Sequence, residues 1–289
     1  MRLCFASSRQ PRLNAVVCVL HCEDDGMIRA ATQTLETQDK TDLAYFAQSR
    51  PAESEAAAVA RVLRLARQSG ARVYLVHLST AAALEQVRLA RSRGQLVYAE
   101  TCPQYLVLTQ DCYQSAEPET FVMCPPLRTQ ADCDALWAAL ADGTIQTIGT
   151  DHCSFTHAQK IASGVKIGAV PGGCAGVAQR AQLLYTYGVC KGRITPEQFI
   201  SLLSSEPARI YGMPDRGRIE PGMIADLVIW NPETHTTLTH ENHLHACDRS
   251  PYAGMQLVGG ARTVFLCGEI VADNGSLIQT GKGQYLARR

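Results

Sequence analysis

The segment Val73-Tyr74-Leu75-Val76-His77-Leu78-Ser79-Thr80 indicates how the rest of the chain is organised. Four apolar residues that favour β structure lead into a histidine, and a small polar turn follows. The pattern predicts a buried strand that carries the side chain of His77 at its carboxyl end.

The same pattern recurs at three other places in the chain. Apolar runs that end at residues 20, 99 and 150 lead directly into His21, Glu100 and Asp151. Between these runs the sequence predicts helices that end at a glycine, and this alternation is typical of a parallel sheet. Because the carboxyl ends of parallel strands lie at one edge, the pattern predicts a parallel barrel with its chemistry at that face.

Composition excludes several classes of function. The 289 residues carry 27 basic and 27 acidic side chains, so nothing favours a nucleic-acid partner. No apolar run approaches the roughly 18 residues of a membrane helix, so we expect no membrane partner. The 12 cysteines form no CxxC pair, and Cys18 and Cys267 lie in apolar strands. We therefore expect buried free thiols and a cytoplasmic location.

Three segments differ in character. Residues 1–15 hold three arginines and no acid, and we expect an irregular start rather than a targeting signal. Residues 16–214 carry the strand and helix pattern, with helices expected at 53–68, 80–93, 131–141, 177–187, 196–204 and 207–211. Residues 215–289 predict a small β unit, with a strand at 225–230 and a hairpin that turns near Gly268.

His21, His77 and Asp151 are the candidates for chemistry. Two neutral imidazoles and a carboxylate can share a zinc-type ion, which would lower the pKa of a bound water to about 7. Asp151 could also accept the proton of that water. The same three residues could instead be satisfied structural side chains, and the pattern alone selects neither a metal nor a substrate. We expect the remaining loop histidines to be solvated: His157, His235, His240, His243 and His245.

A set of motifs, in this order, resembles the dihydropyrimidinase and hydantoinase branch of the amidohydrolase superfamily. The most specific are Glu100-Thr-Cys-Pro-Gln-Tyr-Leu106 and Cys124-Pro-Pro-Leu-Arg128. The others are His21-Cys-Glu-Asp24, Val76-His-Leu-Ser79, Gly149-Thr-Asp-His-Cys153, Leu183-Leu-Tyr-Thr-Tyr-Gly188, Gly192-Arg-Ile-Thr195, Ala225-Asp-Leu-Val-Ile-Trp230 and Ser250-Pro-Tyr-Ala-Gly254. The resemblance extends from about Val16 to Arg288.

The resemblance implies a hydrolase that opens cyclic amides, such as hydantoins or dihydropyrimidines, with a zinc-bound hydroxide at a two-zinc site. It implies that His21 and His77 bind one metal, and that Asp151 binds the other metal and moves the proton. Cys124 and Gly172 match positions that hold the substrate ring. The resemblance also implies a cytoplasmic homotetramer whose substrate is a cyclic ureide or imide.

The chain also departs from the family pattern. The family's His-x-His motif does not precede His21, and no lysine precedes Lys40 that could supply the bridging ligand. The fold expected is therefore α/β: the carboxyl-terminal half of a metal-dependent amidohydrolase (β/α)8 TIM barrel, followed by a small β-sandwich portion. Half a barrel would leave an unpaired edge and at most a partial zinc site. We expect a truncated form with impaired or no activity alone; the alternatives are a non-catalytic dihydropyrimidinase-like assembly protein or an inactive fragment.

Overall fold

The computed structural model describes residues 16–286 in two compact units. The first unit comprises residues up to Ile145, Gly149–Val177 and His245–Pro251, and the second comprises Gln146–Ile148, Ala178–Leu244 and the residues from Tyr252 on. The irregular start expected at residues 1–15 lies outside the described residues.

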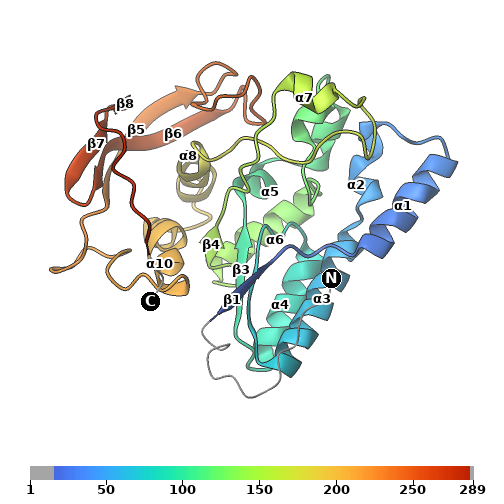
Figure 1. The fold of residues 1–289 in the computed structure, drawn as a ribbon, viewed down its shortest axis with the longest axis horizontal. Coiled ribbons are helices and arrows are strands. Elements are labelled where there is room, and N and C mark those ends of the chain that lie inside the picture. The colour runs from blue at the N-terminus through green and yellow to red at the C-terminus, as the bar shows by residue number, and fades with distance from the viewer. Residues whose placement is uncertain (1–15, 287–289) are drawn as a thin grey trace. The chain divides into compact units, whose positions relative to one another are not determined.

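A parallel sheet forms the centre of the first unit (Figure 1). Its strands β1 (Val17–Leu20), β2 (Arg72–Leu75) and β3 (Val97–Thr101) pair in parallel, with β2 in the middle. Leu75 of β2 and Ala99 of β3 are fully buried, as expected of a parallel sheet covered by helices. Three of the four predicted strands are thus confirmed as parallel neighbours. The fourth, β4 (Thr147–Ile148), is only two residues long and belongs to the second unit.

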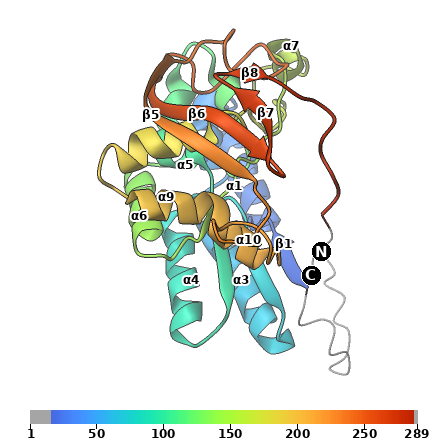
Figure 2. The same cartoon turned by 90° about the vertical axis from the view of Figure 1, so that its left-hand side faces the viewer.

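Three long helices accompany these strands: α3 (Ala52–Ser69), α4 (Ala81–Ser92) and α6 (Gln130–Ala141). Figures 1 and 2 show α3 and α4 side by side along the sheet. The helix α3 buries its small and apolar face, including Val59 and Leu63, and ends where Gly70 adopts a left-handed φ of 72°. Thr129 and Asp132 form a capping box that starts α6. The sequence predicted all three helices to within one or two residues.

Shorter elements complete the first unit. They are the helices α1 (Asp25–Thr37), α2 (Phe46–Ser49), α5 (Pro103–Val107) and α7 (His157–Ile161), and single 3-10 turns at Leu43–Tyr45, Gln110–Gln114 and Pro118–Phe121.

The second unit joins helical turns to an antiparallel sheet. The sheet has the order β5 (Leu227–Thr237), β6 (Gln256–Leu266), β7 (Glu269–Asp273) and β8 (Ser276–Leu277). The predicted hairpin at Gly268 joins β6 to β7 and is confirmed. The helices are α8 (Arg180–Leu184), α9 (Pro196–Ile200) and α10 (Glu206–Ile210), and π-helical turns at Tyr185–Val189 and Ser201–Ser205 extend α8 and α9.

The cysteines agree only in part with the prediction of buried free thiols. Every cysteine among residues 16–286 is a free thiol, as predicted. The prediction that Cys267 is buried is wrong, because this residue is exposed at the β6–β7 turn.

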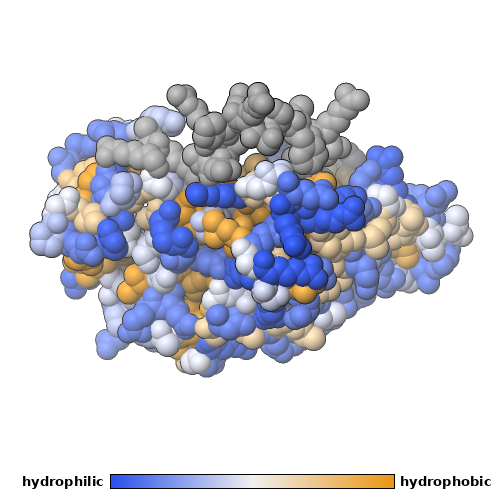
Figure 3. Space-filling model, turned by 90° about the horizontal axis from the view of Figure 1, so that it is seen from below, coloured by the Kyte–Doolittle hydropathy of each residue, from blue (hydrophilic) through white to orange (hydrophobic). Residues whose placement is uncertain are grey.

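No helix in the described part of the chain is long and apolar enough to cross a membrane. Figure 3 shows a face where hydrophilic side chains surround smaller hydrophobic patches.

Candidate metal centre

Two histidines at neighbouring strand ends face one another. His21 directly follows β1 and His77 lies two residues beyond β2, and these two strands are paired in register. The Nδ1 atom of His21 lies 3.0 Å from the Nε2 atom of His77. The structure therefore confirms that these two strand ends converge, as the sequence predicts.

The second ring nitrogen of His21 is held by a buried carboxylate. His21 Nε2 lies 3.0 Å from an oxygen of Glu23, whose side chain is only 1% exposed. Arg50 donates to both oxygens of Glu23, from Nε and from a terminal nitrogen. Burial opposes ionisation of Glu23, but the hydrogen bonds from His21 and Arg50 outweigh it and lower the carboxyl pKa. A carboxylate in this place fixes the imidazole orientation and tautomer, as it does for histidines that bind metals.

A second buried carboxylate fixes the turn that carries His77. Glu55, from the first turn of α3, accepts hydrogen bonds from the Ser79 amide at 2.9 Å and from the Thr80 hydroxyl at 2.5 Å. Burial raises the pKa of Glu55 despite these donors. Arg128 connects the turn after His77 with Arg50, the residue that binds Glu23. It donates to Ser79 Oγ at 3.2 Å and to the backbone oxygen of Arg50 at 2.5 Å.

The backbone is strained at two of the three predicted ligands. His77 has a φ of 42° and Asp151 a φ of 48°, which is the left-handed region that residues other than glycine seldom adopt. Such conformations persist where the surroundings impose them, and they are concentrated at functional sites. The Glu55 contacts supply that constraint for the turn after β2.

The histidine pair fits one half of a zinc-type site. Burial, and then the neighbouring His21, lower the pKa of His77 to about 4, so its imidazole is neutral at pH 7 and able to bind a metal. Two nitrogens at about 2.0 Å from a tetrahedral ion would lie about 3.3 Å apart, close to the 3.0 Å observed. The Nδ1 atom of His77 is buried and has no hydrogen-bond partner among the described residues.

Asp151 is near this pair without completing it. The negative charge of Asp151 partly offsets the lowering of the His77 pKa. Among residues 16–286, however, no three His, Cys, Asp or Glu side chains are grouped closely enough to hold a metal ion. The structure thus brings His21 and His77 together and leaves Asp151 outside a three-ligand set. The adjacent His152 uses its Nδ1 to accept a hydrogen bond from the Gly176 amide, so it supports a loop.

The two predicted ring-binding residues lie beside one another. A Cβ atom on Gly172 would lie 3.0 Å from the Cys124 Sγ, so the absence of a side chain there allows the close approach. Lys160 joins the two segments, since its Nζ donates to the backbone oxygens of Val122 at 2.8 Å and of Pro171 at 2.9 Å. Burial lowers the pKa of this lysine to about 8.

Several supporting residues were not found from the sequence: Glu23, Arg50, Glu55 and Lys160. Only Glu23 carried a signal, because it lies two positions after His21 in the quoted His-Cys-Glu-Asp motif. Arg50 and Glu55 reach the site from 27 and 24 residues away from their partners, and no local pattern reports such contacts.

Comparison with known proteins shows the family of this chain. The model of the amidohydrolase family matches residues 21–271. The chain is 38% identical over 281 residues to a D-phenylhydantoinase of Escherichia coli. The aligned region covers 96% of this chain and 61% of that protein.

Solved structures give the same result. The D-hydantoinase of Bacillus sp. AR9 superimposes with a TM-score of 0.91 at 34% identity, over 94% of this chain and 61% of that one. The dihydropyrimidinase of Brevibacillus agri superimposes with a TM-score of 0.88 at 34% identity, over 91% of this chain and 58% of that one. The chain therefore spans about three fifths of the length of these relatives. It belongs to the amidohydrolase family, as a homologue of the D-hydantoinases and dihydropyrimidinases.

Proposed function

We propose that the chain carries the ring-binding part and half of the metal site of a cyclic-amide hydrolase. The reaction would open the ring of a hydantoin or dihydropyrimidine. Water adds to a ring carbonyl, the C–N bond breaks, and the departing nitrogen takes a proton. The observation that carries this proposal is the His21–His77 pair, 3.0 Å apart and oriented by Glu23.

Each residue has a proposed part. His21 Nδ1 and His77 Nε2 would hold a zinc ion, which when bound supplies Lewis acidity toward water and the ring carbonyl. The carboxylate of Asp151 would accept the proton from water and pass it to the ring nitrogen. Cys124 and Gly172 would hold the ring, and Lys160 would keep their two segments in contact.

We further propose that this chain corresponds to the carboxyl-terminal half of a (β/α)8 barrel and is inactive alone. Parallel sheets are normally covered on both faces, yet Val16 is 52% exposed and Val19, in β1, is 51% exposed. Two imidazoles are also one protein ligand short of the three that catalytic zinc sites usually have. Both features suit a site that needs further strands and ligands.

Ring opening of hydantoin and dihydrouracil tests the proposal, with purified full chain in zinc and after chelation. We expect turnover in zinc to equal the chelated control. Zinc-dependent turnover that is abolished in His77→Ala would confirm the hydrolase assignment and overturn the proposed inactivity. Turnover that survives in His77→Ala would overturn the assigned roles.

A non-catalytic assembly role is the second candidate. It is favoured because no three-ligand group exists among the described residues while the family fold is kept. On this alternative the chain forms the homotetramer implied for the family but retains no zinc. Sedimentation velocity and metal content of the same sample separate the two candidates.

A further inference from the structure

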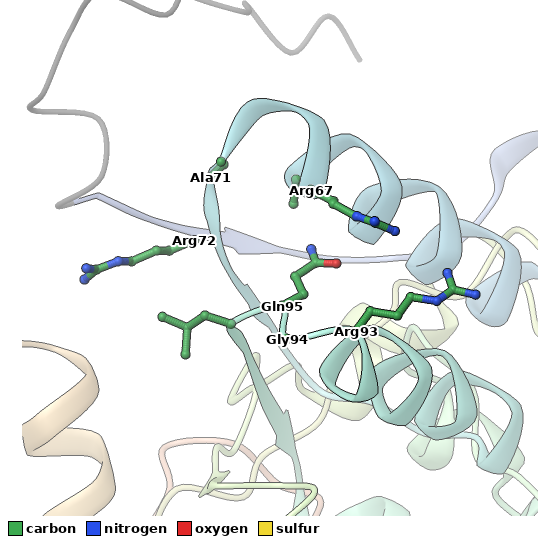
Figure 4. Close-up of a pocket in the computed structure, with 9 residues that line it drawn as sticks. Arg67, Ala71, Arg72, Arg93, Gly94 and Gln95 are labelled. Carbon is green, nitrogen blue, oxygen red and sulfur yellow. The ribbon is translucent and has the colours of Figure 1, made fainter.

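A pocket lies at the amino-terminal end of the strands, opposite to the end that carries the histidine pair. Its volume is about 440 Å³, and it opens between the carboxyl ends of α3 and α4, where β2 and β3 begin (Figure 4). The lining includes Arg67, Arg72, Arg93, Gln95 and Leu96, and no acidic residue. All of these side chains belong to the first unit.

The side chains of the three arginines of this pocket lack partners in the described part of the chain. Neither hydrogen bonds nor ion pairs join their guanidinium groups to any residue of 16–286. Neighbouring arginines on the same two helices are occupied. Arg61 pairs with Asp24 at 2.8 Å, Arg88 pairs with Glu85 at 2.9 Å, and Arg91 donates to the Val97 oxygen at 2.8 Å.

The helix ends do not use these guanidinium groups as caps. The Ala66 oxygen of α3 accepts from the amides of Gly70 and Ala71, and the Leu63 oxygen accepts from Gln95 Nε2 at 2.9 Å. Two helix C-termini contribute a partial charge of about −1 in total, against three full positive charges. The pocket therefore carries a net charge of about +2.

We propose that this pocket binds a small polyanion with two or more phosphate or carboxylate groups. Figure 4 shows Arg67 and Arg93 extending in the same direction from the two helix ends, with Gln95 between them, while Arg72 extends to the other side. A guanidinium group binds phosphate and carboxylate oxygens through paired hydrogen bonds. Leu96, which is 50% exposed, offers an apolar contact to the carbon part of such a molecule.

Isothermal titration of the metal-free full chain at low ionic strength tests the site, with inorganic pyrophosphate and citrate as separate probes. We expect one probe or both to bind with a submillimolar Kd. Loss of two charged hydrogen-bond donors in the double variant Arg67→Ala/Arg93→Ala should weaken binding by at least about tenfold. Pyrophosphate binding alone would identify a phosphate ligand, and citrate binding alone a polycarboxylate; either supports the proposal.

Arg64 provides the matched control. It lies on α3, is exposed, and is outside the pocket lining. Arg64→Ala removes one guanidinium charge from the same helix, whereas the double variant removes two. We expect this single change outside the pocket to alter the Kd by less than about twofold. The proposal is overturned if neither probe binds, or if Arg64→Ala weakens binding as much as the double variant does. Thermal unfolding of each variant establishes that it is folded before titration.

Discussion

Replacing Glu23 by Gln should destabilise the first unit and weaken the zinc binding proposed for His21. Glu23 is 1% exposed and accepts from His21 and twice from Arg50. Glutamine keeps one acceptor but places an NH₂ group against a donor, and it leaves the Arg50 guanidinium, 21% exposed, without its counter-charge. Loss of one partner from a buried pair costs about 3–5 kcal/mol. Because Arg50 is partly hydrated, we expect a loss of about 2–3 kcal/mol in the free energy of unfolding.

The pH dependence of this loss follows from the lowered pKa of Glu23. Below a pH of about 4.5 the unfolded chain binds more protons at this position than the folded chain does. The stabilisation by the carboxylate is therefore complete above that pH and is lost as the pH falls. The difference between wild type and Glu23→Gln should shrink from pH 7 to pH 4.

Urea unfolding followed by fluorescence measures the effect in a Trp230→Phe background. The chain has two tryptophans, and Trp137 lies in the first unit, so its signal reports on that unit alone. Glu85→Gln is the control, since Glu85 pairs with Arg88 at the surface and should contribute less than about 1 kcal/mol. Equal losses in Glu23→Gln and Glu85→Gln would refute the reasoning.

Three further substitutions test other parts of the site. Glu55→Ala leaves the donors of Ser79 and Thr80 without an acceptor, and it should lower the free energy of unfolding in urea by about 3 kcal/mol. The control Glu53→Ala removes an exposed carboxylate from the same turn and should lower it by less than about 1 kcal/mol. Gly149→Ala would place a Cβ 2.5 Å from Glu100 Oε1 and should cost about 1–3 kcal/mol in thermal unfolding; the same loss in a Glu100→Ala background would exclude the clash as its cause. Between pH 8 and 10.5 the free energy of unfolding of the wild type should rise by up to about 3 kcal/mol relative to Lys160→Met, because the pKa of Lys160 is lower in the folded chain than in the unfolded chain. A constant difference between the two proteins across that pH range would contradict this prediction.

The sequence was sufficient for the elements whose residues repeat with a simple period. The apolar runs ahead of His21 and His77 predicted strands, and glycine stops such as Gly70 predicted helix ends, because both signals are local. Convergence of the two histidines followed from the parallel arrangement alone.

Features set by tertiary contacts were beyond the reach of the sequence. Cys267 looked buried, but it occupies a turn with a φ of 52° and its side chain is exposed. His243 was expected to be solvated, and this expectation is wrong: it is 1% exposed, and its backbone oxygen accepts from Gln179. The Glu23–Arg50 pair joins residues that no periodicity relates.

Zinc content after equilibrium dialysis is the most direct measurement of the proposed half-site at His21 and His77. We predict about one weakly held ion per chain in the wild type and in His235→Ala, an exposed histidine of the second unit, and none in His77→Ala. Two ions in the wild type, no ion, or one ion retained in His77→Ala would each contradict the assignment.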